Sequence, residues 1–227
     1  MKRIILFVFV VVLHQVGLAQ TYELKGKITG LTSDSLLLLK TKGKVFEAAK
    51  IKVTNGTFFY SESIVEPYFV QLFKLKKGKN ETEGKLAELL VAPGKINITG
   101  DAAQFNTIKI EGSAPDKILK AYLKEDGLLA KRWEKLKEEY DSYITNGDTV
   151  SRKKIGLSLN YILLKERIPL LKKYVSANSN TIVGALLPNF CTLKDALKKA
   201  DYLEMYTTLT PSMQQTDYGK SLFEKTK

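Results

Sequence analysis

Apolar and polar residues alternate along the first half of the chain, from about position 21 onward. Tyr22, Leu24 and Ile28 are separated by charged or small neighbours, which places the apolar side chains on one face of an extended segment. Similar alternation, or a short aromatic or β-branched run, recurs up to Gly112. The pattern predicts seven or eight short strands, at positions 22–28, 36–39, 45–53, 58–60, 68–73, 86–91, 96–99 and 107–110.

Turn residues separate these predicted strands. Positions 30–34 have turn composition, and Pro93-Gly94 turns the chain before 96–99. Asn55-Gly56 is the strongest signal, because this dipeptide supplies the positive φ angles of a two-residue hairpin. No long helical pattern interrupts the series, so we expect an antiparallel β-sandwich-like domain, or a partly open barrel, over 21–112.

The hydrophobic period changes at Ser113. Ser113, Pro115 and Asp116 are typical of a helix start, with a cap, a proline in the first turn and an acid near the positive end of the dipole. A long helix should follow and end at 146–148. A second helix is predicted to carry Ile155, Leu159, Ile162, Leu163 and Leu170, and Pro169 should kink or split it. Shorter helices are predicted at 182–187, 193–199, 202–208 and 218–224.

The predicted fold class is therefore α+β, with an antiparallel β-sandwich-like domain over 21–112 and an all-α helical domain over 113–227. In the long helix we expect the residues at helical spacing to be buried against neighbouring helices. These residues are Tyr122, Trp133, Leu136 and Tyr140.

The first twenty residues have the layout of a secretory signal peptide. Lys2-Arg3 precedes ten apolar residues at 4–13, and Gly17 and Ala19 form a small-residue cleavage site. Ten residues are too few to span a bilayer. We expect cleavage after Ala19 or Gln20, and no cysteine follows the cut to carry a lipid. The predicted product is periplasmic, has no membrane span and is not a lipoprotein.

The chain of 227 residues carries a net charge of +12, or +10 without Lys2 and Arg3. Its lysines alternate with glutamates, as on a solvated helix face, so nucleic acid is not an expected partner. The one concentrated basic segment is 74–79. We interpret it as a solvated hairpin loop; contact with an anionic surface is the alternative.

Residue types exclude several kinds of chemistry. The one histidine, His14, lies in the predicted leader, and Cys191 is the one cysteine. A Ser-His-Asp or Cys-His set, a zinc site and a C-x-x-C pair therefore cannot be built from the exported part. Glycine-rich phosphate loops and calcium-loop spacing are also missing from the sequence. No catalytic residue, metal site or cofactor is predicted.

Weaker candidates for chemistry are carboxylates, the cysteine and the tryptophan. Glu138 and Glu139 are adjacent on a helix and diverge by about a hundred degrees, and Asp101 and Glu111 lie at strand ends, so solvation is the favoured interpretation. Cys191 is expected to be a small, partly buried apolar residue, with a reactive thiol as the alternative. The Trp133 stripe is expected to be core, with a ligand platform as the alternative.

Several segments resemble a known family. The segment 22–31, the hairpin at 55–58, and the stretches 93–101 and 110–113 are similar to a β-rich domain of unknown function. That domain precedes a thioredoxin-like domain in exported disulfide-interchange proteins of Gram-negative bacteria. The stretches 173–181 and 217–222 resemble the family's helical connector.

The family's W-C-x-x-C motif has no counterpart before Lys227, so its reductase activity is not carried over to any residue. The sequence is expected to be a free-standing relative of the front half, or a truncated form of a longer redox protein. We expect a non-catalytic envelope module for binding or scaffolding, with an envelope protein or peptide, or a separate thioredoxin-like protein, as partner. One alternative is the substrate-docking half of a periplasmic disulfide reductase whose thioredoxin-like domain is missing or encoded separately; a carboxylate-based hydrolase is a third.

Two short stretches also resemble an O-glycosylation sequon of some Gram-negative exporters. They are Asp34-Ser35-Leu36 and Asp148-Thr149-Val150, and both are expected to be exposed.

Overall fold

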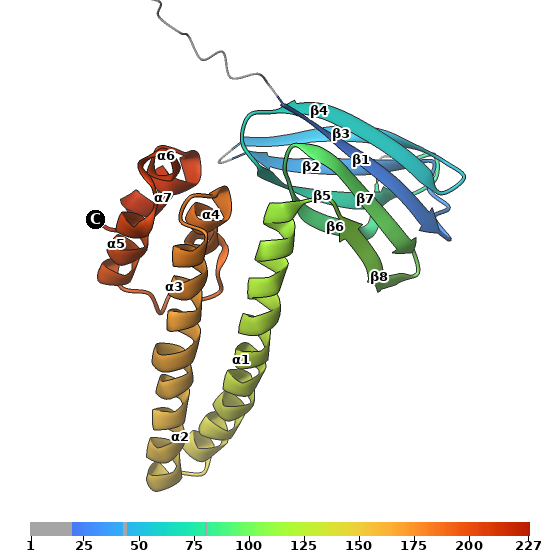
Figure 1. Ribbon diagram of the computed structural model, residues 1–227. Coiled ribbons are helices and arrows are strands. Elements are labelled where there is room, and N and C mark those ends of the chain that lie inside the picture. Colours follow the sequence, from blue (N-terminus) through green and yellow to red (C-terminus); the bar gives the residue numbers. More distant parts are fainter. Residues whose placement is uncertain (1–19, 43–44, 80) are drawn as a thin grey trace, which may run out of the picture.

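The computed structural model describes residues 20–42, 45–79 and 81–227 (Figure 1). Apart from Gln20, the predicted export leader lies outside the described residues, and so does His14. The described chain forms a β region followed by a helical region, which confirms the α+β class.

The β region contains eight strands. They are β1 (Gln20–Thr29), β2 (Ser35–Lys42), β3 (Val45–Thr54), β4 (Thr57–Ile64), β5 (Tyr68–Leu75), β6 (Thr82–Val91), β7 (Gly94–Asp101) and β8 (Gln104–Glu111). All eight join one sheet in the order β6-β5-β2-β3-β4-β1-β7-β8. The terminal strands of that order, β6 and β8, contact each other, so the sheet curls nearly into a barrel.

Two details of the predicted β domain differ from the structure. A sandwich of two separate sheets is not confirmed, because one sheet holds all eight strands. The pairing is also not wholly antiparallel, since β1 and β7 run parallel with Leu24 opposite Ile96. A parallel pair needs a long connection, and β2 to β6 supply it without a crossover helix.

The core of the β region forms from the inward positions of the alternating strands. Its largest fully buried side chains include Tyr22, Leu24, Leu38 and Leu72. The predicted hairpin is confirmed at Asn55-Gly56, whose φ angles of 51° and 71° are those of a tight two-residue turn.

The helical region begins where the sequence predicts. Its elements are α1 (Ala114–Thr145), α2 (Thr149–Tyr161), the π-helical segment η1 (Ile162–Arg167), α3 (Ile168–Ala177), α4 (Ile182–Phe190), α5 (Lys199–Thr208), α6 (Pro211–Gln214) and α7 (Asp217–Glu224). Ser113 caps α1, and its side chain accepts a hydrogen bond from the Asp116 amide. Asn146 ends α1, and Asp148 caps α2 by accepting from the Ser151 amide.

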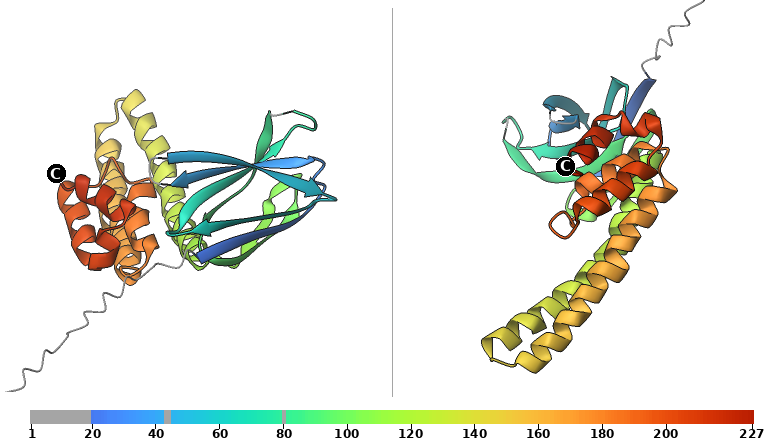
Figure 2. Two further views of the ribbon diagram at one scale, coloured as in Figure 1. Left: turned by 90° about the horizontal axis from the view of Figure 1, so that it is seen from above. Right: turned by 90° about the vertical axis from the view of Figure 1, so that its left-hand side faces the viewer.

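The long helix α1 pairs with α2 in a hairpin that projects away from the rest of the molecule (Figures 1 and 2). Two helices alone cannot enclose a side chain, so the predicted burial of the α1 residues is wrong for those far from the body of the molecule. Tyr122 lies near the body and is buried, whereas Trp133, Leu136 and Tyr140 are only partly buried.

Two other helix predictions need correction. The second helix is not split at Pro169, because η1 ends two residues before the proline and α3 follows it directly. A kink at this proline stays a prediction. The predicted helix at 193–199 is wrong, because residues 192–196 form turns. Leu193 and Leu197 are nevertheless buried, so their spacing correctly indicated core positions although this segment does not form a helix.

The two regions pack directly on each other. The Ser113 hydroxyl donates to the Leu90 carbonyl, and the Leu90 amide donates to Asp116 Oδ1 at 2.9 Å. The Leu90 side chain belongs to the helical core, beside residues of α4 such as Leu186 and Leu187. This junction fixes the start of α1 against β6 and so positions the helices at one end of the strands.

Candidate functional site

A cleft lies between one end of the β region and the helices α4 and α7. It consists of two adjoining pockets of about 720 Å³ and about 320 Å³, and Lys42, Asp217 and Tyr218 line both. Residues of β2, of the β4–β5 connection, of α4 and of α7 therefore meet here. Figures 1 and 2 show these helices beside the strand ends. Binding sites commonly occupy such junctions between structural units.

Aromatic rings form the apolar part of the cleft. Phe190, at the end of α4, is 41% exposed, and its ring lies 6.0 Å from that of Tyr218 and 5.9 Å from that of Phe69. Tyr218 is only 7% exposed, yet its hydroxyl has no hydrogen-bond partner among the described residues. Burial raises the pKa of Tyr218 to about 12, and the nearby Glu66 and Asp217 carboxylates add to this effect. The phenol is therefore a neutral donor that lacks an acceptor.

Lysines dominate the charge of the larger pocket. Lys42, Lys194, Lys220 and Lys225 line it with two acids, Asp217 and Glu224. Burial lowers the pKa of Lys225, and the positive charge of Lys194 lowers it further. Like charges held together out of water favour an anion between them. The pocket therefore combines aromatic surface with surplus positive charge, and Tyr218, one of its lining residues, carries the unpaired hydroxyl donor.

A partly buried charge network adjoins the cleft at this end of the β region. Lys40 Nζ is 3.0 Å from Glu62 Oε1 and 2.9 Å from Glu47 Oε2, and its side chain is 8% exposed. Lys42 Nζ reaches the same two carboxylates at 3.1 Å and 3.0 Å. Lys42 also lies over the ring of Tyr68, 4.9 Å from its centroid.

Tyrosines complete this network. Glu62 Oε2 accepts from Tyr60 at 2.9 Å and from Tyr68 at 3.0 Å, and the Tyr22 hydroxyl is 3.3 Å away. Burial by itself would raise the pKa of Glu62, but the hydrogen bonds of its lysine and tyrosine partners outweigh it and lower the pKa to about 2. Glu62 is thus a fixed anion, which suits a structural role better than proton transfer near neutral pH.

Strand alternation explains how these polar side chains reach the interior. Lys40 and Lys42 continue the inward face that Leu36 and Leu38 begin on β2. Glu62 likewise stands at one of the inward positions of β4. The sequence therefore carried a signal, namely charged residues at core-facing positions. The alternation could not show that side chains of β2 and β4 contact each other, because these strands are not neighbours: β3 lies between them in the sheet.

The carboxylates and the cysteine named from the sequence do not form a site. Glu138 is exposed on α1, and Asp101 Oδ1 accepts from the Ala103 amide in a strand connection. Cys191 is 3% exposed, and burial raises the pKa of its thiol. The cysteine was expected to be partly buried, and the structure buries it almost completely. Two cations, Lys194 and Lys225, lie near the thiol.

The basic segment and the two glycosylation-like stretches named from the sequence lie at different places in the structure. In the basic segment, Lys74 and Leu75 belong to β5, whereas Lys76 pairs with Glu81 across an exposed turn, as a solvated hairpin requires. Ser35 is buried and donates to Asp34 Oδ1, so the first glycosylation-like stretch is not exposed as predicted. Thr149 in the second stretch is exposed; its modification stays a prediction.

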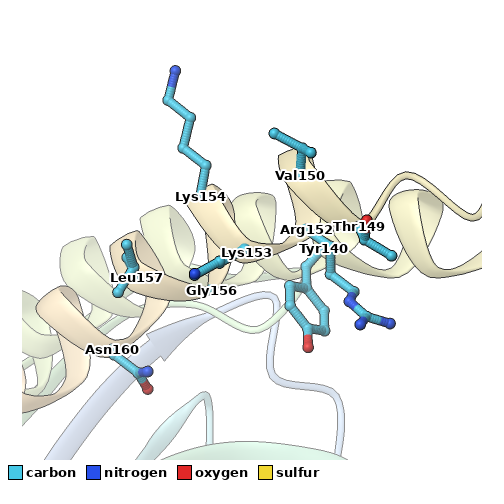
Figure 3. Close-up of a pocket in the computed structure, with 9 residues that line it drawn as sticks. All are labelled: Tyr140, Thr149, Val150, Arg152, Lys153, Lys154, Gly156, Leu157 and Asn160. Carbon is cyan, nitrogen blue, oxygen red and sulfur yellow. The ribbon is translucent and has the colours of Figure 1, made fainter.

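A further hollow of about 800 Å³ lies on the α1–α2 hairpin, between Tyr140 of α1 and Arg152 and Leu157 of α2. Figure 3 shows that its side chains point to different sides of the helices and do not converge on one point. Among the residues that the structure describes, no group of three His, Cys, Asp or Glu could hold a metal ion. Within the same described ranges, no helix combines the length and apolar character needed to cross a bilayer.

The comparison with protein families covers the β region. Residues 22–119 match the family described as Domain of unknown function (DUF4369). No curated protein matches the chain. The DUF4369 match contains all the members of the charge network, from Tyr22 to Tyr68. It ends at Leu119 in α1, so Phe190, Tyr218 and three of the cleft lysines, Lys194, Lys220 and Lys225, lie outside it. The cleft therefore lies between the segment that matches DUF4369 and a helical part that the match does not include.

Proposed function

We propose that this chain is a non-catalytic, exported envelope module whose cleft binds a ligand with an anionic group beside an apolar part. The observation that carries the proposal is the unpartnered hydroxyl of the buried Tyr218, a residue that lines a pocket with four lysines and Phe190. A buried donor without an acceptor costs free energy, which a bound acceptor group would recover.

The charge network supports binding more than catalysis. Lys40 and Glu62 satisfy each other, and the tyrosine hydroxyls occupy the remaining acceptor positions of the Glu62 carboxylate. A saturated network of this kind stiffens its surroundings. Its function is to hold Lys42 at the edge of the cleft, because Lys42 belongs to the network and also lines both pockets.

An anionic aromatic dye, anilinonaphthalene sulfonate, tests the proposal, since it combines a sulfonate with fused rings. We expect the double variant Lys194→Gln/Lys220→Gln to weaken dye binding about tenfold, as removal of two charge-assisted contacts implies. Tyr218→Phe should also weaken binding, without loss of stability, because it removes only the unpaired hydroxyl.

The matched control is Lys27→Gln/Lys95→Gln, which neutralises two exposed lysines on β1 and β7. This control should bind the dye like the unaltered chain. Equal binding by the cleft variant and the control, or no saturable binding at all, would contradict the proposal.

The alternative proposal is the substrate-docking half of a periplasmic disulfide reductase, with a thioredoxin-like domain encoded separately. It is supported by the resemblance of the β region to the front domain of such proteins and by the burial of Cys191, which leaves the thiol chemistry to a partner. A reading frame for a thioredoxin-like protein directly beside this gene would favour the alternative. An unrelated neighbour would favour the independent module.

A further inference from the structure

The outer side of α2 carries an apolar stripe that nothing in the molecule covers. Val150, Leu157 and Tyr161 are 79%, 65% and 60% exposed, and Leu164, one turn on in η1, is 49% exposed. Spacings of seven and four residues place such positions on one side of a helix. The α-helical part of the stripe, from Val150 to Tyr161, is about 17 Å long at 1.5 Å per residue.

This side of α2 is distinct from the side that packs on α1. Leu159 and Ile162 are buried, and they are the positions that anchor the hairpin. In Figure 3, Val150 and Lys154 point to the same side of α2, away from Tyr140 of α1. The helix therefore has two apolar sides, of which the hairpin uses one.

The charge around the stripe has a single sign. From Thr149 to Lys165 the sequence contains Arg152, Lys153, Lys154 and Lys165 and no acid. The described ion pairs of these helices, such as Arg132 with Glu166 and Lys137 with Asp141, involve none of the four cations. Lys153 and Lys154 flank the stripe on its two sides, as their helical positions require.

We infer that the outer face of α2 docks on an anionic lipid surface. Exposed apolar side chains rimmed by unpaired cations are what an interfacial helix needs: the apolar stripe enters the headgroup boundary and the cations meet lipid phosphates. The hairpin projects from the body, so a flat surface can reach its outer side (Figures 1 and 2).

Charge argues against a second copy of the chain as the occupant. In a symmetric contact each α2 stripe would face the other, and the two sets of cations around Lys153 and Lys154 would be brought together. An anionic bilayer has the opposite sign over its whole area. This surface is separate from the cleft, so the inference does not depend on the proposed ligand.

Vesicle sedimentation tests the inference with the chain starting at Gln20, which retains every described residue. We expect binding to vesicles of phosphatidylglycerol and phosphatidylcholine in equal parts, weaker binding at high salt, and little binding to phosphatidylcholine alone. Leu157→Asp and, separately, Lys153→Glu/Lys154→Glu should each reduce the bound fraction about tenfold.

Two controls match these variants. Leu203→Asp makes the same substitution at an exposed leucine of α5, which is 49% exposed. Lys77→Glu/Lys79→Glu reverses two exposed charges in the β5–β6 turn. Both should bind vesicles like the unaltered chain. Thermal melting by circular dichroism must show that the α2 variants remain folded, which their exposed positions favour.

Three results would overturn the inference. One is equal binding to both kinds of vesicle, or none to either. Another is an equal loss in the β5–β6 variant, which would move the contact to the basic turn. The last is a dimer in sedimentation velocity that Leu157→Asp converts to a monomer, because a second copy would then be the occupant.

Discussion

Arg167 and Asp126 form a bidentate ion pair that is almost completely buried. Arg167 Nε lies 2.7 Å from Asp126 Oδ1, and a terminal guanidinium nitrogen lies 2.8 Å from Oδ2. The same nitrogen donates to Thr192 Oγ1 at 2.7 Å. The pair therefore joins α1, the end of η1 and the turn that follows α4. The hydrogen bonds to Asp126 hold the pKa of Arg167 above its usual value despite burial.

Asp126→Ala should destabilise the protein by about 3–5 kcal/mol, because it leaves a buried guanidinium without its counter-ion. Urea denaturation followed by circular dichroism measures this change. Glu166→Ala is the matched control, since it removes an ion pair between the same two elements whose Arg132 partner is exposed. The control should cost less than about 1 kcal/mol. Similar costs for both variants would show that Arg167 reaches water in the folded protein.

Acid should remove the contribution of Glu62 in a defined pH window. Its folded pKa of about 2 lies below the ordinary value of 4.5, so the unfolded chain binds a proton first as the pH falls. The stabilisation is complete above pH 4.5 and is lost as the pH falls toward 2. The shift corresponds to about 3 kcal/mol at most.

Glu62→Gln isolates this contribution from the other acids. The variant should be less stable than the unaltered chain at neutral pH, because Lys40 then keeps only Glu47 as a carboxylate partner. The difference in unfolding free energy between the two proteins should narrow between pH 4.5 and 2. A difference that stays constant over that range would mean that Glu62 has an ordinary pKa.

The hydrophobic pattern predicted local structure well and long-range contacts poorly. The Asn55-Gly56 hairpin, the Ser113 cap and the break at Asn146 were all predictable, because each depends on the residues of its own turn. The parallel pairing of β1 with β7 was not, since it depends on how the sheet curls. The predicted helix at 193–199 failed for a related reason: burial of Leu193 gives the same spacing signal in a turn.

The candidate site was less predictable than the fold. Lys40 and Glu62 stand at inward strand positions, which the alternation reveals. Their ion pair, however, joins two strands that are not neighbours in the sheet, which the alternation does not reveal. Tyr218 and Phe190 lie in short helices, and no motif in the sequence marks them as site residues. Their place in a cleft depends on the packing of α4 and α7 against the strand ends, which no local pattern encodes.

Trp133 is a fluorescent probe of how exposed the α1–α2 hairpin is to solvent. It is the one tryptophan in the chain and is only partly buried on α1. Trp133→Ala should therefore cost about 1–2 kcal/mol, less than the 3–5 kcal/mol typical of a fully buried aromatic residue. Tyr122→Ala, at a buried position of the same helix, should fall in that higher range. Acrylamide should quench the Trp133 fluorescence readily; strong protection would indicate that the outer hairpin is covered.

The Cys191 thiol should be unreactive in the folded protein, and the isolated chain should not catalyse thiol–disulfide exchange. Burial raises the thiol pKa, and the positive charges of Lys225 and Lys194 do not reverse this effect. The thiolate is the reacting species, so attack on a disulfide is slow when the pKa is raised and the sulfur is 3% exposed. Release of the mixed disulfide would also need a second thiol, which the chain does not contain. Ellman's reagent should react with Cys191 slowly in buffer and rapidly in urea. Insulin reduction with a regenerating reductant should give the same rate with the unaltered chain, with Cys191→Ser and without protein. Repeated turnovers that disappear in Cys191→Ser would make this residue an active-site nucleophile and would end the non-catalytic proposal.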